Sequence, residues 1–171
     1  GDLVFLSPDG VRTIAGTARI GDVELGSVSR QIQDIVETIA KGIDGFIIDS
    51  VVLRQKSQYR LFYTTSTQAA SDAKGIIGSL TSNGFEWSET KGIQARAVTS
   101  GFNSAGVEQT FHGDSNGYIY VHDNGDSFIH SGSEADIRAT YKTPNYDFGD
   151  FGTRKNMRYV KISVTPEGTA Q

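Results

Sequence analysis

The sequence predicts a mainly β protein, with β-propeller-like blades of short antiparallel strands and one amphipathic helix. Apolar and polar residues alternate over most of the 171 residues, as expected where successive side chains of a strand point to opposite faces. The chain has 20 glycines and three prolines, and glycine-containing turn signals separate the alternating segments. Many short strands joined by such turns are typical of sandwiches, barrels and propellers.

A hairpin is expected near the N-terminus. Residues 3–6 are apolar, and the Ser7-Pro8-Asp9-Gly10 sequence that follows is a turn signal, because proline presets φ and glycine relaxes the last position. Residues 11–14 would return as the second strand. A further short strand is predicted at residues 17–20.

Residues 28–41 change to the helical period and predict the helix. Ser27 is the expected N-cap, and the helix is expected to end at Lys41-Gly42. We expect it to pack on the sheet of its own chain rather than on a neighbouring subunit. Its apolar stripe consists of Val28, Ile32, Ile35, Val36 and Ile39.

The period of two returns at Phe46 and predicts most of the remaining strands. The segments FIIDSVVLRQ and YRLFYTT would pair across a turn at Lys56-Ser57-Gln58, and residues 75–80 and 85–89 across Ser82-Asn83-Gly84. Four strands at close spacing are typical of one propeller blade or half of a sandwich. Such a series is predicted at residues 93–99, 107–112, 118–122 and 127–129.

The stretch GDSNGYIYVHDNGDSF, residues 113–128, has the clearest hairpin pattern. Asn116-Gly117 and Asn124-Gly125 are pairs that two-residue turns favour, because both central positions of such turns need positive φ. The side chains between them are expected to alternate between two faces. One face would hold Tyr118, Tyr120 and His122, and the other Ile119 and Val121.

The C-terminal part predicts a second region. Residues 137–144 are expected to be extended, residues 145–156 to form a loop rich in glycine and aromatic residues, and residues 157–166 to form a strand. We therefore predict two domains. Residues 1–134 would hold the blades and the helix, and residues 135–171 would lead toward a second sheet or sandwich.

Composition excludes several kinds of site. Without cysteine the chain cannot form disulfides, thiolate metal sites or a cysteine nucleophile. The chain has a formal charge of −4 and a pI near 5.3. It therefore lacks the basic character expected of a protein that binds nucleic acid or anionic membranes. No apolar run approaches the roughly 20 residues that span a bilayer, and the first ten residues do not resemble a signal peptide. We expect a soluble chain without a membrane anchor.

Three histidines suggest a metal site, but the pattern favours turn chemistry. His112 and His122 would lie on neighbouring strands, yet the nearby aspartates are of the kind that bond their own backbone in loops. The run that starts at Asp114 also lacks the glutamate needed at the twelfth position of a calcium loop, where Gly125 stands. We predict no metal and no cofactor. The residues considered are His112, His122, His130, Asp114, Asp123 and Asp126.

Paired carboxylates do not predict catalysis either. Glu86 and Glu89 would point to opposite faces of one strand, so they are not placed as acid and base. Asp147 and Asp150 lie in the glycine-rich loop, where solvated surface charge is the favoured role. We predict that the chain is not an enzyme.

The aromatic residues could form a sugar-binding platform that includes Trp87, although packing within sheets is the favoured role. The loop at residues 145–156 is the exception, because its aromatics and cations suit a contact between subunits or domains. An ordinary loop is the alternative. The candidate contact residues are Tyr146, Phe148, Phe151, Arg154 and Lys155.

Several segments together resemble one family. They are LSPDGVRTIAGT with the SVSRQIQDIV helix, SVVLRQKSQYRLFY, HGDSNGYIYVHDNG and YKTPNYDFGDFGTRKNMRYVKI. This set resembles the nozzle proteins of short-tailed bacteriophages, also called tail tubular protein B, and related tail stabilisation proteins. The resemblance implies that YRLFY marks a blade and that HGDSNGYIYVHDNG marks the next hairpin. It also implies that the segment beginning YKTPNYDFG leaves the propeller for a β-sandwich. Within these segments, the charged residues to consider first are Arg12, Lys155 and Arg158.

The resemblance implies a structural protein of the virion tail. Rings of such subunits, commonly hexamers, would enclose the channel through which DNA leaves, with the tail adaptor protein and tail fibre proteins as further partners. DNA would pass without specific binding, and an acidic channel would suit this because each phosphate contact with Lys or Arg adds affinity. Nozzle proteins are several times longer, so we expect this chain to be a piece of a larger protein.

Two other functions remain open from the sequence. The first is a host-surface or carbohydrate-binding β module of a phage or bacterial adhesin. The second, less favoured, is a propeller glycosidase.

Overall fold

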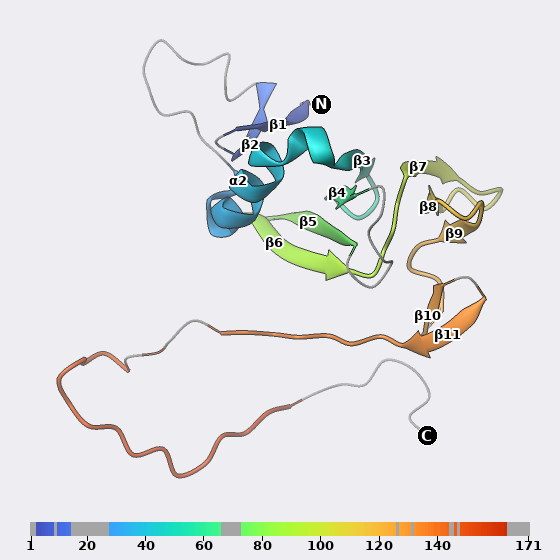
Figure 1. Ribbon diagram of the computed structural model, residues 1–171. Helices are drawn as coiled ribbons and strands as arrows, with labels where there is room; N and C mark the ends of the chain where they lie inside the picture. Colours follow the sequence, from blue (N-terminus) through green and yellow to red (C-terminus); the bar gives the residue numbers. More distant parts are fainter. Residues whose placement is uncertain are drawn as a thin grey trace. The chain divides into compact units, whose positions relative to one another are not determined.

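A computed structural model describes residues 3–8, 10–14, 28–65, 73–125, 127–130, 132–143, 146 and 148–163 (Figure 1). The chain divides into two compact units, Gly1–Asn124 (unit 1) and Gly125–Gln171 (unit 2). Of the described residues, 45% lie in strands and 12% in helices, which confirms the predicted mainly β class with one helix. The predicted domain boundary at residue 134 stays a prediction, and each unit is described separately below.

Unit 1 begins with the predicted hairpin. Strand β1 (Val4–Ser7) pairs antiparallel with β2 (Gly10–Thr13), with Val4 opposite Thr13 and Ser7 opposite Gly10. Residues 15–27, which include the predicted strand at 17–20 and the predicted N-cap Ser27, lie outside the described residues.

The predicted helix at residues 28–41 forms, but its α-helical part begins later than predicted, because residues 28–29 lie in a turn. A 3-10 turn, η1 (Arg30–Ile32), leads into α2 (Gln33–Lys41), which ends before Gly42 as predicted and is followed by η2 (Ile43–Gly45). Instead of capping the helix, the buried Ser29 hydroxyl accepts a hydrogen bond from the Val11 amide at 2.9 Å. This bond fastens the helix entrance to the hairpin.

A four-stranded antiparallel sheet follows as a meander. Its strands are β3 (Ile47–Leu53), β4 (Gln58–Thr64), β5 (Lys74–Thr81) and β6 (Gly84–Lys91), paired in that order. The turns lie where the sequence predicts them, with Ser57 at φ 52° and Gly84 at φ 108°. Glycine suits residue 84 because its backbone adopts positive φ without steric cost.

Strand β4 is buried on both faces. One face packs against the hairpin and the helix, which confirms that the helix packs on its own sheet. On the other face, the Phe62 ring packs against His122, with ring centroids 5.5 Å apart. The core on the helix side contains Val11, Val36, Ile39, Tyr59, Leu61, Tyr63 and Ile76.

A three-stranded sheet lies beside this meander. Its strands, β7 (Ala97–Phe102), β8 (Glu108–Gly113) and β9 (Ile119–Val121), pair in chain order. Residues 93–96 of the predicted strand 93–99 are not in a strand. Strand β7 contacts β3 through hydrogen bonds from the Val98 amide to Asp49 Oδ2 and from the Ser100 hydroxyl to the Val52 carbonyl. The described strands do not close a barrel, and their arrangement is compatible with propeller-like blades.

The predicted two-residue turn at Asn116-Gly117 is wrong, because Asp114 builds a longer loop. Asp114 Oδ1 accepts hydrogen bonds from the amides of Asn116 at 2.8 Å and Tyr118 at 3.0 Å. The Asp114 amide in turn donates to the Tyr118 carbonyl, and Gly117 has the positive φ that the loop needs. The competing bonds of an Asx-type turn therefore outweigh the Asn-Gly preference.

The second Asn-Gly pair is not a hairpin turn either. Strand β9 pairs with β8, whereas β10 (Ser127–His130) pairs with β11 (Ser133–Asp136) in unit 2. Asn124-Gly125 therefore lies at the division between the units. The predicted series of four strands is accordingly split, with three of them in one sheet.

The rest of unit 2 has no regular secondary structure in its described part, residues 137–143, 146 and 148–163. The predicted strand at 157–166 is therefore wrong over residues 157–163, and residues 164–166 lie outside the described part. Its side chains are exposed, with Tyr159 at 86% and Ile162 at 79%. A strand needs hydrogen bonds from a neighbour, and alternation in the sequence does not supply that neighbour.

Replacing Gly78 by alanine should destabilise unit 1 by about 2 kcal/mol, because the new Cβ would overpack the sheet. That Cβ would lie 2.8 Å from two atoms of the Trp87 ring, which is held by a hydrogen bond from its Nε1 to the Val28 carbonyl. Urea unfolding measures the change. Gly45→Ala is the control, since nothing lies within 4 Å of its Cβ; equal stability losses in the two variants would contradict the prediction.

Candidate functional site

A cluster of polar side chains joins the two larger sheets of unit 1. We call Lys56, Arg60, His112, His122 and Asp123 the histidine–arginine cluster. Arg60 comes from β4, where its side chain is 6% exposed, and donates to Asp123 Oδ2 at 2.7 Å. Lys56, from the β3–β4 turn, reaches the same oxygen at 2.6 Å. Two cations of the four-stranded sheet are thus tied to the end of β9.

The two histidines extend this network into the three-stranded sheet. His112 Nδ1 and His122 Nε2 are 2.7 Å apart, and Arg60 Nη1 lies 3.5 Å from His122 Nδ1. Because the guanidinium can only donate, a neutral His122 carries its proton on Nε2 and donates to His112. The Tyr120 ring stacks on His112, with centroids 4.8 Å apart.

The predicted facing of β9 is supported by these contacts. Tyr120 and His122 contact His112, and the Tyr118 ring lies 6.2 Å from that of Tyr120. The apolar residues face solvent instead, with Ile119 at 78% and Val121 at 39% exposure. The polar and aromatic face of this strand is therefore the inner one.

The cluster shifts the pKa values of its members. Burial, together with His112 and Arg60, lowers the pKa of His122 to about 4, although Asp123 opposes the shift. Burial alone would raise the pKa of Asp123, but the hydrogen bonds from Arg60 and Lys56 outweigh it and lower that pKa. At neutral pH the cluster thus holds two cations, one carboxylate and a neutral His122.

A cavity of about 150 Å³ lies next to the cluster. Lys56, His122 and Asp123 line it together with Thr110, whose buried hydroxyl has no hydrogen-bond partner among the described residues. A cavity of this size can hold ordered water, which would satisfy such a hydroxyl. Its mixed charges give no sign of a particular ligand.

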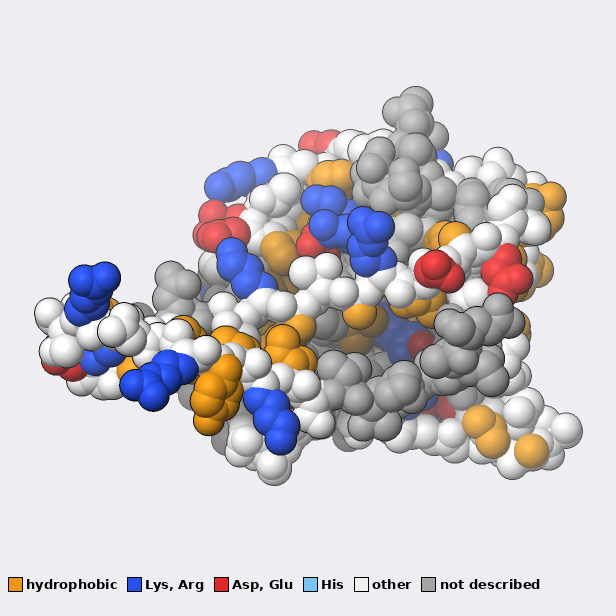
Figure 2. All heavy atoms as spheres, turned by 90° about the horizontal axis from the view of Figure 1, so that it is seen from below, with side chains coloured by type: hydrophobic (Ala, Val, Ile, Leu, Met, Phe, Trp, Pro, Cys, Tyr) orange, Lys and Arg blue, Asp and Glu red, His pale blue; other side chains and the backbone are white. Residues whose placement is uncertain are grey.

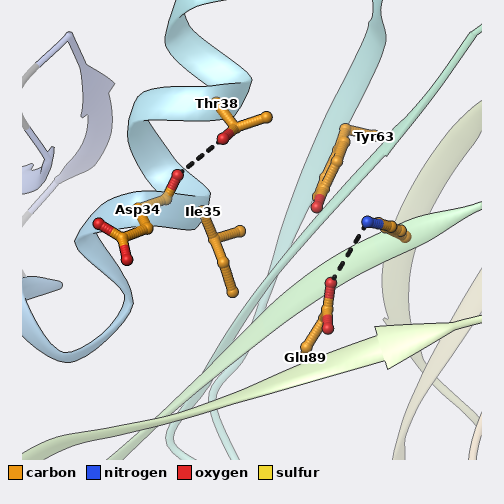
Figure 3. A pocket seen from close by; sticks show the side chains of 6 residues that line it. Asp34, Ile35, Thr38, Tyr63 and Glu89 are labelled. Carbon is orange, nitrogen blue, oxygen red and sulfur yellow. Dashed lines mark hydrogen bonds and ion pairs between the residues drawn. The ribbon is translucent and has the colours of Figure 1, made fainter.

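A second hollow, of about 190 Å³, lies between α2 and the four-stranded sheet (Figure 3). It is lined by Asp34, Ile35 and Thr38 of the helix and by Tyr63, Lys74 and Glu89 of the sheet. Lys74 and Glu89 form a long ion pair of 3.9 Å. Burial, with a contribution from Glu89, raises the pKa of Tyr63 to about 12, so this hydroxyl stays protonated.

The predicted contact residues of unit 2 are exposed. Tyr146, Phe148 and Phe151 are 64%, 62% and 94% exposed, and the rings of Tyr146 and Phe148 lie 6.2 Å apart. Arg154 and Lys155 are also exposed. The space-filling view shows hydrophobic side chains beside Lys and Arg side chains on one face (Figure 2). The role of the five predicted residues as a contact between subunits or domains stays a prediction.

The three cations singled out with the family resemblance differ in their exposure to solvent. Arg12 is buried in β2, at 6% exposure, and packs within unit 1. Arg158 is exposed, like Lys155. Of these three cations, the exposed Arg158 and Lys155 are available to a partner.

The metal and carboxylate candidates form no recognisable centre. Within the described ranges, no group of three or more His, Cys, Asp or Glu side chains could hold a metal ion. The His130 side chain and Asp126 and Asp147 are outside the described set. Asp150 accepts hydrogen bonds from the Gly152 amide and the Thr153 hydroxyl of its own loop.

Sequence reasoning missed two features. Residues 113–117, Gly-Asp-Ser-Asn-Gly, have the spacing of a nucleophile elbow, but they form the β8–β9 loop rather than the strand-to-helix turn that such an elbow requires. Ser115 there is exposed and its hydroxyl contacts Gln94 at 3.5 Å. The second is Arg60, whose only signal is a cation inside the apolar run YRLFY.

Trp87 does not form an exposed platform. Its ring is partly buried against the core, stacks on Phe85 with centroids 5.5 Å apart, and donates to the Val28 carbonyl. A ring used in this way covers the sheet and is not free to stack on a sugar.

No helix in the described part of the chain is long and apolar enough to cross a membrane. The described part of unit 1 thus includes two adjoining sheets, a polar cluster that ties them together and the two small hollows described above. Comparison with known proteins finds no family model, curated protein or solved structure that matches the chain.

Proposed function

We propose that this chain is a structural protein of a phage tail, part of a nozzle that encloses the DNA exit channel and holds the tail assembly together. The observation that carries the proposal is the four-stranded antiparallel meander with YRLFY in its second strand, adjoined by a second antiparallel sheet. In the family that the sequence resembles, these residues mark successive blades. The support is a likeness of sequence motifs, together with an antiparallel sheet where YRLFY predicts a blade.

Exposed apolar surface also supports a role in assembly. The outer face of the three-stranded sheet presents Ile119 and Val121, and unit 2 presents Tyr141 at 89% and Tyr159 at 86% exposure. Large apolar side chains that stay uncovered in a single chain commonly belong to contacts with further protein. A ring subunit, or a piece of a longer one, needs such contacts.

The proposed partners are other copies in a ring, a hexamer in the full-length protein, with the tail adaptor and tail fibre proteins. DNA would pass through the channel without specific binding, in keeping with the formal charge of −4. On this proposal the chain acts in the virion tail and catalyses no reaction. The tryptophan that would test the carbohydrate-binding alternative packs on the core.

Electron microscopy of the full-length gene product tests the proposal. We expect rings with a central channel, and antibodies raised against residues 1–171 should label one end of tailed particles. Labelling of the whole capsid surface, or none on particles whose genome encodes the chain, would contradict the proposal. Glycan binding by monomers of the full-length protein would instead support the adhesin alternative.

A further inference from the structure

Residues 154–163 form an unpaired, basic, strand-like segment. Their sequence, RKNMRYVKIS, contains four cations and no acidic residue, and alternates in polarity over its second half. None of their backbone groups has a hydrogen-bond partner among the described residues. Val160 and Ile162 are 70% and 79% exposed. A segment of this kind can add to the open edge of a sheet.

Charge is unevenly divided between this region and the rest of the chain. Residues 137–163 contain six Lys and Arg against two Asp, whereas residues 1–136 contain ten Lys and Arg against seventeen Asp and Glu. The basic region therefore fits an acidic surface of the kind that the first 136 residues supply.

Strand β6 provides an acidic edge. It is the last strand of the four-stranded sheet, so one of its sides has no neighbouring strand within that sheet. Glu86 and Glu89 lie three residues apart and therefore on opposite faces of the sheet. The two ion pairs of Glu89, with Lys74 at 3.9 Å and Lys91 at 3.8 Å, are long and leave its carboxylate able to accept another cation.

The spacing of charges restricts the register, and the apolar residues then select one. Arg158 and Lys161 are also three residues apart, so an antiparallel pairing that sets Arg158 opposite Glu89 sets Lys161 opposite Glu86. A parallel pairing of Arg158 with Glu86 and of Lys161 with Glu89 would match the charges as well, but it would set Val160 opposite Ser88 and Ile162 opposite Thr90, so these two residues would lose apolar partners. An antiparallel shift of two residues would set Arg158 opposite Lys91 or Trp87 and lose both pairs.

The same register matches the apolar residues. Val160 falls opposite Trp87, and Ile162 falls opposite Phe85, on the face that packs toward the helix. On the other face, Tyr159 falls opposite Ser88. Arg158 would then reach toward the hollow beside Glu89, which Asp34 also lines (Figure 3).

We propose that residues 156–163 of one copy add as a fifth, antiparallel strand to β6 of a second copy. The choice of a second copy rests on the proposed role in assembly, and on the complementary charges of the segment and of the β6 edge. Because the donated segment and the accepting edge are different surfaces, the contact is head-to-tail and can propagate around a ring.

Disulfide trapping tests this contact, and the absence of native cysteine makes it specific. Chains carrying Ser88→Cys are mixed with differently tagged chains carrying Tyr159→Cys under mild oxidation. Both positions are exposed, and the proposed register sets them opposite each other. We expect about tenfold more mixed disulfide than with Ser163→Cys as the control, which is four residues out of register and beyond disulfide reach.

Charge reversal provides a second readout. Arg158→Glu with Lys161→Glu, or Glu86→Lys with Glu89→Lys, should each abolish association measured by analytical ultracentrifugation. Chains with both reversals should associate again, because the pairs are restored with opposite sign.

Three outcomes would overturn the inference. They are equal trapping in the matched and control mixtures, no rescue by the combined reversal, and a Ser88→Cys/Tyr159→Cys chain that cross-links only within itself. Rings of the full-length product without trapping would refute this strand contact alone. Trapping without labelled particles would refute the tail function and keep the contact.

Discussion

Replacing Phe62 by alanine should lower the free energy of unfolding of unit 1 by about 3–5 kcal/mol, the cost of removing a large buried aromatic ring and leaving a cavity. The Phe62 side chain is 1% exposed and fills the space between the two larger sheets, where it meets His122. It also lies over Gly75, whose added Cβ would approach its ring to 2.9 Å.

Urea unfolding followed by the fluorescence of Trp87, the single tryptophan, measures this loss. Val52→Ala in the neighbouring strand β3 is the matched control, since Val52 is 52% exposed and its truncation should cost about 0.5 kcal/mol. A Phe62→Ala variant no less stable than this control would show that the two sheets do not pack through β4.

Acidification should destabilise unit 1 between pH 6.5 and pH 4. The pKa of His122 is about 4 in the folded chain, against an ordinary value of 6.5. Above pH 6.5 the ring is neutral in both states, and between the two values only the unfolded chain binds the proton. Stability therefore falls as pH falls, by about 3 kcal/mol in total, because each pKa unit is worth about 1.4 kcal/mol.

The reason is the surroundings of His122. Burial contributes most, and His112 and Arg60 add to it in disfavouring a proton on the ring, whereas Asp123 favours the proton. Unfolding midpoints at pH 7, 5.5 and 4 measure the effect, with His122→Gln as the control that cannot titrate. If the variant lost as much stability as the parent chain over this range, the acid response would lie elsewhere.

Local patterns predicted most of unit 1 and little of unit 2. The β1–β2 hairpin, the end of α2 and the turns of the meander follow from residues that are neighbours in sequence, such as Gly84 after Ser82-Asn83. Residues 157–163 have equally clear alternation but no strand, because alternation describes how side chains divide between faces and a ladder requires a second strand. The Asp114 loop was missed because two local preferences compete there.

The candidate site was predictable only in part. That His112 and His122 would lie on neighbouring strands followed from the hairpin pattern. Arg60 is 62 residues away from His122 in sequence, and its approach depends on how the two sheets meet. Burial of β4 on both faces is a tertiary property, and a cation within YRLFY gave no indication of which face would receive it.

Every strand pair in the described chain joins strands that are neighbours in sequence, from β1–β2 to β10–β11. The loops that must close to form these ladders are therefore short, and the entropy of closing them is small. Pairing of this kind keeps the contact order of each sheet low, which favours rapid formation of the individual sheets. During synthesis, each sheet can form once its own strands have left the ribosome, without waiting for the remainder of the chain.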